Sequence, residues 1–123
     1  VETTLLPDKT LTRVSGTHVP TGAAVEGYEI HLGKTAGTDC LRPFALLEGR
    51  PDGAISPSGQ VMGSYLHGCF GSDEFRSKFL ESLGVSASTL RFEQTLETTL
   101  DALAQHLETH LDLDRLLSLA GEV

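Results

Sequence analysis

The sequence has few cysteines and no long apolar segment, and each shortage narrows the range of functions. Its 123 residues include two cysteines, Cys40 and Cys69, which are too few for a disulfide scaffold. A reducing compartment, the cytoplasm, is therefore the expected location. No apolar run approaches the roughly 20 residues that span a bilayer, and no basic, apolar leader opens the chain. We therefore expect no membrane partner.

Basic residues are also scarce. Nine Lys and Arg face 17 Asp and Glu, which gives a net charge of -8. Nucleic acid is therefore not an expected partner, because phosphate binding needs clustered Lys and Arg. Hydrophobic residues make up 39% and charged residues 21% of the chain, as in an ordinary globular domain. An initiator methionine is missing too, so we expect residues 1–123 to be one truncated part of a longer polypeptide.

The first half of the chain has the patterns of β-strands. Alternating apolar and polar residues predict strands over 9–16 and 23–33, and a short apolar run predicts another over 43–48. Residues 34–42 lack periodicity and are predicted to be a loop, and 49–53 a turn. A hairpin is expected over 54–66, with Pro and Gly in its turn and His67 at the end of its second arm.

The second half has the patterns of helices. Ser72 is a good N-cap for a helix that Gly84 ends, and 85–90 is predicted to be a linker. A leucine stripe predicts a helix over 92–110, and Asp112 is expected to cap a last short helix. The predicted fold class is α/β, with strands first and helices last.

His67 is the main candidate for chemistry. It follows the apolar run 60–66, precedes the flexible Gly68, and stands shortly before a helix. Open α/β sheets place functional groups at such strand ends, and histidine is the usual proton shuttle near neutral pH. The alternative is a histidine that only fills a corner between strand and helix.

Glu29 and His31 share one face of their predicted strand. They could hydrogen-bond to one another or line a cleft, or they could form a solvent-facing pair on an exposed sheet. Both interpretations remain open from the sequence.

The cysteines are weaker candidates. His67 and Cys69 are the materials of thiolate catalysis, but the segment 68–71 lacks a nucleophile elbow. Both Cys69 and Cys40 are therefore predicted to be small buried hydrophobes.

No close-spaced ligand motif supports a metal at His31 or His67, and His106 with His110 lacks a third ligand, so no metal is expected.

Several blocks together resemble one family, the cobyric acid synthases, which are the glutamine-dependent amidotransferases of cobalamin biosynthesis. The resemblance is to the C-terminal part of their class I glutamine amidotransferase domain and extends to about residue 83. The blocks are Val1-Glu2-Thr3-Thr4-Leu5, Lys9-Thr10-Leu11, Gly27-Tyr28-Glu29-Ile30-His31-Leu32-Gly33, Pro51-Asp52-Gly53-Ala54, Gly63-Ser64-Tyr65-Leu66-His67-Gly68-Cys69-Phe70 and Phe75-Arg76.

The resemblance implies a flavodoxin-like domain with a mixed sheet, attached to an ATP- and Mg²⁺-dependent synthetase domain. A cysteine thiolate attacks the amide of glutamine, and a histidine that matches His67 protonates the departing ammonia. The synthetase site uses this ammonia to convert adenosylcobyrinic acid a,c-diamide, a corrinoid, to adenosylcobyric acid. No cofactor is expected in this chain itself.

Two departures from the family pattern matter. The nucleophile cysteine is absent from this chain, so the fragment alone is expected to be inactive. Many class I amidotransferases place a glutamate two residues after the histidine to orient the imidazole, and Cys69 stands there instead. Glu29 is the candidate for that role.

The resemblance leaves other functions open. A related enzyme, such as cobyrinic acid a,c-diamide synthase or a cell-wall glutamate amidase, would share the Cys/His chemistry. A non-catalytic assembly module is the alternative from another class. In each case the expected partner is the rest of the parent polypeptide, and a truncated sheet with exposed apolar surface is expected to self-associate.

Overall fold

The structure is a computed structural model, and it describes residues 1–86 and 89–121. The chain forms two compact units, Val1–Thr89 and Leu90–Val123, which are treated separately below. The linker predicted over 85–90 includes residues 87 and 88, which lie outside the described residues.

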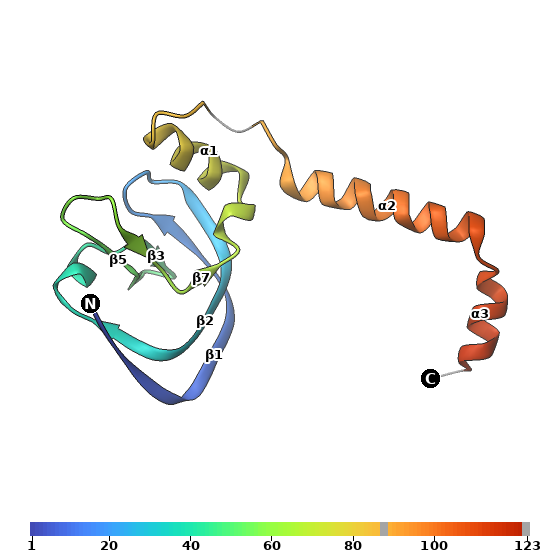
Figure 1. Ribbon diagram of the computed structural model, residues 1–123, viewed down its shortest axis with the longest axis horizontal. Coiled ribbons are helices and arrows are strands. Elements are labelled where there is room, and N and C mark those ends of the chain that lie inside the picture. Colours follow the sequence, from blue (N-terminus) through green and yellow to red (C-terminus); the bar gives the residue numbers. More distant parts are fainter. Residues whose placement is uncertain (87–88, 122–123) are drawn as a thin grey trace. The chain divides into compact units, whose positions relative to one another are not determined.

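A long antiparallel hairpin is the centre of the first unit. β1 (Glu2–His18) pairs with β2 (Ala24–Ala36) along nearly its whole length, and Figure 1 shows the two strands curving together in blue and cyan. The strands predicted over 9–16 and 23–33 are therefore confirmed, but the observed strands are longer than both predicted ranges. Their register shifts between Leu5 and Thr10, around Pro7, because proline cannot donate to the ladder.

The loop predicted over 34–42 is wrong in part. The end of β2 pairs with the start of β1, as in Glu2↔Ala36, so non-local hydrogen bonds extend the strand beyond its sequence pattern. A 3₁₀ helix, η1 (Thr38–Leu41), follows.

β3 (Ala45–Leu47) and β4 (Arg50–Asp52) form a second, tighter hairpin. Its two-residue turn consists of Glu48 (φ 50°) and Gly49 (φ 79°). Positive φ at both positions is typical of a type I′ turn. The turn predicted over 49–53 is therefore displaced, because those residues contain a strand.

The hairpin predicted over 54–66 is confirmed only in its first part. β5 (Ala54–Ile55) pairs with β6 (Met62–Gly63) in a small separate sheet. The chain then bends at Tyr65, directly after Ser64, whose hydroxyl donates to the Asp52 carboxylate and accepts from the Leu66 backbone N–H. His67 therefore lies in its own strand, β7 (Leu66–His67), which joins the main sheet in the order β4-β3-β1-β2-β7.

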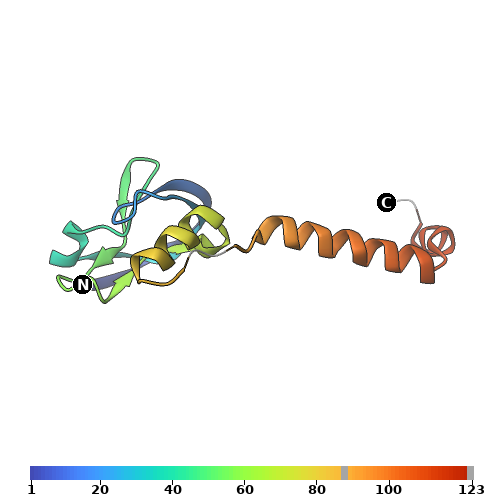
Figure 2. The same ribbon diagram turned by 90° about the horizontal axis from the view of Figure 1, so that it is seen from above.

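Helix α1 (Asp73–Ser82) closes the first unit and lies beside the hairpin end of β2 (Figures 1 and 2). Ser72 caps it as predicted and accepts a hydrogen bond from the Phe75 backbone N–H. Phe75 is fully buried in the core, and Phe79 packs against it. The buried core is formed by Val14, Ala23, Val25, Phe44, Ala45, Leu47, Leu66, Cys69 and Phe75.

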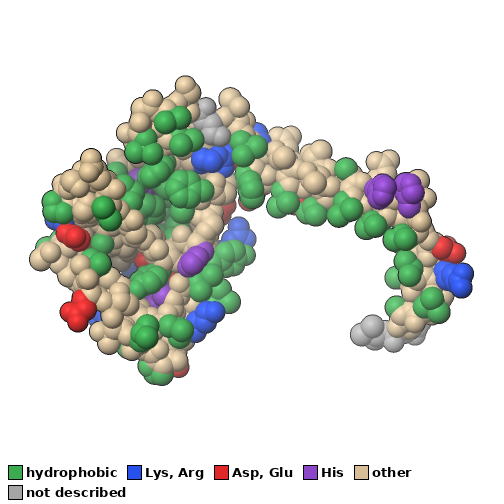
Figure 3. Space-filling model, viewed as in Figure 1, with side chains coloured by type: hydrophobic (Ala, Val, Ile, Leu, Met, Phe, Trp, Pro, Cys, Tyr) green, Lys and Arg blue, Asp and Glu red, His purple; other side chains and the backbone are tan. Residues whose placement is uncertain are grey.

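The second unit consists of α2 (Phe92–His110) and α3 (Leu113–Ala120). Both helices were predicted, and Asp112 caps α3 by accepting from the Arg115 backbone N–H. Leucines line one side of α2, visible as a row of green side chains in Figure 3, and all of them are at least partly exposed. The predicted order of strands first and helices last is confirmed.

Candidate functional site

His67 lies where the sequence predicts, at the end of a strand and before a helix. Gly68 follows in the left-handed region (φ 81°), and a 3₁₀ turn, η2 (Cys69–Gly71), leads to α1. His67 stands opposite Tyr28 on β2, and directly opposed residues direct their side chains to the same face. That face is exposed, since both side chains are exposed. Among the described residues, the His67 imidazole makes no hydrogen bond, so it is accessible for proton transfer.

Gly27 permits the close approach that positions His67. A Cβ on Gly27 would lie 2.2 Å from the carbonyl oxygen of His67. This distance is too short for any side chain to be tolerated at position 27. The backbone of β7 therefore occupies the space that a side chain on β2 would otherwise take.

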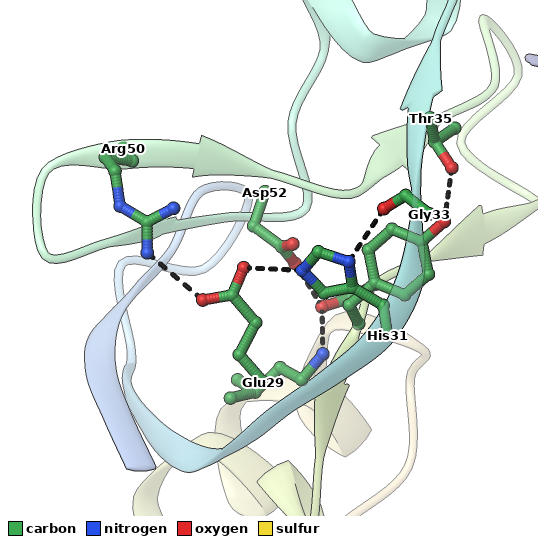
Figure 4. A network of polar contacts seen from close by, with 9 residues as sticks. Glu29, His31, Gly33, Thr35, Arg50 and Asp52 are labelled. Atoms are coloured by element: carbon green, nitrogen blue, oxygen red, sulfur yellow. Dashed lines mark hydrogen bonds and ion pairs between the residues drawn. The ribbon is translucent and has the colours of Figure 1, made fainter. Parts of the chain in front are cut away.

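Glu29 and His31 lie on the opposite, inner face of β2 and form a polar network with Arg50 (Figure 4), in which Glu29 is buried and Arg50 is exposed. His31 Nε2 lies 3.1 Å from Oε1 of Glu29, and Arg50 Nη2 donates to Oε2 at 3.1 Å. The ring of Tyr65 stacks on His31 with its centroid 4.5 Å away. The predicted shared face of Glu29 and His31 is confirmed, and the solvent-facing alternative is wrong, because Glu29 is only 8% exposed.

The geometry does not support Glu29 as the residue that orients His67. Glu29 is opposite the buried Leu66 in the sheet, whereas His67 is opposite the exposed Tyr28. Neighbouring residues of a strand point to opposite faces, so the Glu29 carboxylate and the His67 imidazole lie on different sides. The Glu29 carboxylate is directed instead to His31 and Arg50.

A cavity of about 460 Å³ opens beside this network. Glu29 and His31 line it as the cleft interpretation proposed, together with Arg50 from β4. Burial raises the pKa of Glu29, but the hydrogen bonds and charges of Arg50 and His31 outweigh burial and leave this pKa below its usual value. The other charged or ionisable residues that line the cavity are Lys34, Cys40, Asp52 and Tyr65.

The cysteines differ from one another. Cys69 is buried, as predicted, and burial raises the pKa of its thiol, which disfavours a thiolate nucleophile. Cys40 is only half-buried and lines the cavity, so the prediction of a buried hydrophobe is wrong there, because η1 lies at the surface. Within the described residues, no group of three or more His, Cys, Asp or Glu side chains is arranged to hold a metal.

One residue of the network, Arg50, and one polar residue of the core, His18, were not singled out from the sequence. Arg50 was placed in a turn, and only the non-local pairing of β3 with β4 brings it to Glu29. His18 was placed among turn residues, yet it is 1% exposed and packed against Phe44 and Phe75. The two-residue alternation of β1 continues to His18, and this pattern could have predicted that His18 is buried.

The first 75 residues match the CobB/CobQ-like glutamine amidotransferase domain. This match covers more than half of the chain, so the chain belongs to that family. The α/β fold class, as the C-terminal portion of a class I glutamine amidotransferase domain, is confirmed.

Curated relatives extend the similarity over both units. The chain is 61% identical over 120 residues to a cobyric acid synthase from Cereibacter sphaeroides, 58% over 120 residues to one from Rhodobacter capsulatus, and 52% over 120 residues to one from Bradyrhizobium diazoefficiens. Each alignment covers 98% of this chain and 25% of the relative, so the chain spans about a quarter of their length. The resemblance seen in the sequence is thereby confirmed.

No solved structure matches the chain. None of the described helices combines the length and the apolar character that crossing a bilayer requires.

Proposed function

We propose that this chain is the histidine-bearing part of the glutamine amidotransferase domain of a cobyric acid synthase. The observation that carries the proposal is the placement of His67, exposed at a strand end and without a hydrogen-bond partner among the described residues. The family match and the similarity to cobyric acid synthases support it. The nucleophile cysteine belongs to a part of the polypeptide outside this sequence.

In the proposed reaction, the thiolate of that cysteine attacks the side-chain amide carbon of glutamine. His67 transfers a proton to the departing nitrogen, and ammonia leaves as a thioester forms. Water then attacks the thioester while His67 accepts its proton, which releases glutamate and the thiol. This chain alone has no nucleophile in the required position and is therefore proposed to be inactive.

The released ammonia is used at a synthetase domain of the same cytoplasmic polypeptide. There, ATP with Mg²⁺ activates carboxylates of adenosylcobyrinic acid a,c-diamide, which are amidated to give adenosylcobyric acid. The outer face of the main sheet, on which His67 of β7 lies, also exposes Leu11, Tyr28 and Leu32 beside the Arg13–Glu26 ion pair. The exposed apolar side chains of this face are suited to pack against the cysteine-bearing part of the domain.

The test is ammonia release from glutamine by the full-length protein that contains this sequence. We expect His67→Ala to lower the rate at least a hundredfold, as loss of a general acid–base group does. Exchange of the exposed, hydrogen-bonded His110 for Gln is the matched control. An unchanged rate in a folded His67→Ala protein would leave His67 as a corner residue only.

A further inference from the structure

The His67 imidazole is exposed and has no hydrogen-bond partner among the described residues. Histidines that transfer protons are usually held in one orientation by a hydrogen bond to the ring. Without such a bond, the placement of the imidazole depends on the backbone on either side of His67. The residues that fix this backbone therefore decide where the imidazole lies.

Different elements hold that backbone on its two sides. Before Gly68, the two-residue strand β7 pairs with Tyr28 and Glu29 of β2. Gly68 has a left-handed conformation (φ 81°) and, because it lacks a Cβ, can rotate more freely than other residues. In the 3₁₀ turn η2 that follows, the Gly71 N–H donates to the Gly68 carbonyl oxygen at 2.8 Å. A displacement of η2 would therefore move Gly68 and the end of β7 that carries His67.

Apolar contacts hold η2 against the core and α1. Cys69 is buried in the core. The ring centroid of Phe70 lies 5.1 Å from that of Phe75 and 5.4 Å from that of Phe79. Burial of apolar surface is a non-directional force, so these contacts keep η2 on the helix without fixing its rotation.

Arg76 of α1 supplies directional contacts to the same turn. Its Nη1 donates to the carbonyl oxygen of Phe70 at 2.8 Å and lies 3.5 Å from that of Gly71. Its Nη2 donates to the carboxylate of Asp73, the first residue of α1. The Arg76 side chain is only 12% exposed, so water competes little for these bonds. Because hydrogen bonds weaken steeply when they bend, this guanidinium fixes the orientation of η2 as well as its position.

We propose that Arg76 is a positioning residue for His67, which it holds in place for proton transfer by locking η2 onto α1. This role rests on the proposed glutaminase function of His67. The planar fork of a guanidinium can donate to a carbonyl and a carboxylate at once, whereas a lysine ammonium lacks that geometry. The Phe75-Arg76 pair thus has two tasks, since Phe75 fills the core and Arg76 holds the turn.

Ammonia release from glutamine by the full-length protein tests the proposal. We expect Arg76→Ala to lower kcat by about tenfold to a hundredfold, since a misplacement of about 1 Å has such an effect. The KM for glutamine should stay within about twofold, because the lost contact acts on the chemical step rather than on binding. Millimolar guanidinium should raise the rate of Arg76→Ala and leave the wild-type rate unchanged. Arg76→Lys should have a kcat between those of wild type and Arg76→Ala.

Hydrogen exchange of the same full-length proteins measures the cause. Backbone amides of residues 68–72 should exchange faster in Arg76→Ala than in wild type, whereas those of the β3–β4 hairpin should not change. Lys78→Gln is the matched control, because Lys78 lies on the same helix and forms an exposed ion pair with Glu74. It should alter neither the rate nor the exchange.

Three outcomes would overturn the role of Arg76. The first is a wild-type kcat in a folded Arg76→Ala protein or, if that variant does not fold, in Arg76→Lys. The second is unchanged exchange over residues 68–72. The third is faster exchange throughout the domain without rescue by guanidinium, which would show that Arg76 serves only general stability.

His67→Ala separates this inference from the proposed function. A loss of ammonia release in His67→Ala but not in Arg76→Ala would overturn the role of Arg76 alone. An unchanged rate in His67→Ala would overturn both.

Discussion

His18 and Thr21 are joined inside the core of the first unit, with the imidazole Nδ1 2.7 Å from the threonine hydroxyl. The rings of Phe44 and Phe75 lie 4.7 and 5.0 Å from the imidazole centroid. Nε2 of His18 is buried and has no hydrogen-bond partner among the described residues. A charge on this ring would be poorly solvated, so the histidine is held neutral, and burial lowers its pKa.

The first prediction concerns acid sensitivity. In the unfolded chain His18 gains a proton near its ordinary pKa of about 6.5. In the folded chain the lowered pKa keeps His18 neutral to lower pH. The unfolded state thus binds more protons as pH falls below about 6.5, and the free energy of unfolding decreases by at most about 1.4 kcal/mol per pH unit from this residue. This decrease in the free energy of unfolding continues as pH falls to the lowered pKa that His18 has in the folded chain. It is absent above neutral pH. Urea unfolding at pH 7.5 and 5.5 measures it.

Exchange of His18 for Asn should flatten this pH dependence. Exchange of His106, which is exposed on α2, for Gln is the control and should leave it intact. A wild-type chain that is equally stable at both pH values would contradict the buried neutral state of His18.

Glu29 gives the second prediction. Glu29→Gln removes two charge-assisted hydrogen bonds from a nearly buried site, and we expect a loss of about 2–3 kcal/mol in the free energy of unfolding at pH 7. Because the folded pKa of Glu29 is lowered, its stabilisation is present above the unfolded pKa of about 4.5 and disappears as pH falls through the folded value. Glu26→Gln alters a comparable but exposed Glu–Arg pair and should change stability by less than about 0.5 kcal/mol. Equal effects of the two variants in urea unfolding would count against the network.

Gly27 gives the third prediction. Gly27→Ala forces a Cβ against the His67 carbonyl oxygen, so β7 must move away from β2 and the variant should lose about 1–3 kcal/mol. Amide hydrogen exchange should be faster in β7, because its pairing with Tyr28 and Glu29 is weakened. Gly63→Ala is the matched control, since a Cβ there would meet no atom within 4 Å. Unchanged exchange in the Gly27 variant would show that β7 is held by other contacts.

The fourth prediction concerns the leucine side of α2. Leu96, Leu100, Leu103 and Leu107 are each between 41% and 51% exposed, which is more apolar surface than a lone helix normally leaves in water. We expect the full chain to associate with itself through this side as its concentration rises, whereas the sequence-based expectation of self-association rested on the truncated sheet. Leu103→Glu should reduce this association, while Gln105→Glu should not. Sedimentation velocity over a hundredfold range of concentration tests this, and a monomer throughout would contradict it.

Local signals in the sequence predicted much of the fold. Capping by Ser72 and Asp112, the leucine period of α2 and the alternation of β2 depend on nearby residues, and all were predicted correctly. The extent of β1 and β2 was underestimated, because their outer ends are held by pairing between residues some 30 positions apart. Local periodicity carries no signal for such pairing.

In the candidate site, too, the features set by nearby residues were predicted and those set by pairing between distant residues were not. The common face of Glu29 and His31 followed from the period of a strand, and the position of His67 followed from the order of strand, glycine and cap. Arg50 reaches Glu29 only through the β3–β4 hairpin, whose turn is built by Glu48 and Gly49 rather than by the Pro-Asp-Gly sequence after them. The face on which His67 lies depends on the register of β7 with β2, which no local pattern specifies.

β2 carries the inner-face network through its own side chains and holds His67 through its pairing with β7. Both arrangements therefore depend on the number of residues in β2, which sets its register and the face to which each side chain points. Insertion of a single residue between Gly27 and His31 would turn the following side chains to the other face and upset both at once. Changes of length are therefore expected to be excluded from the middle of β2.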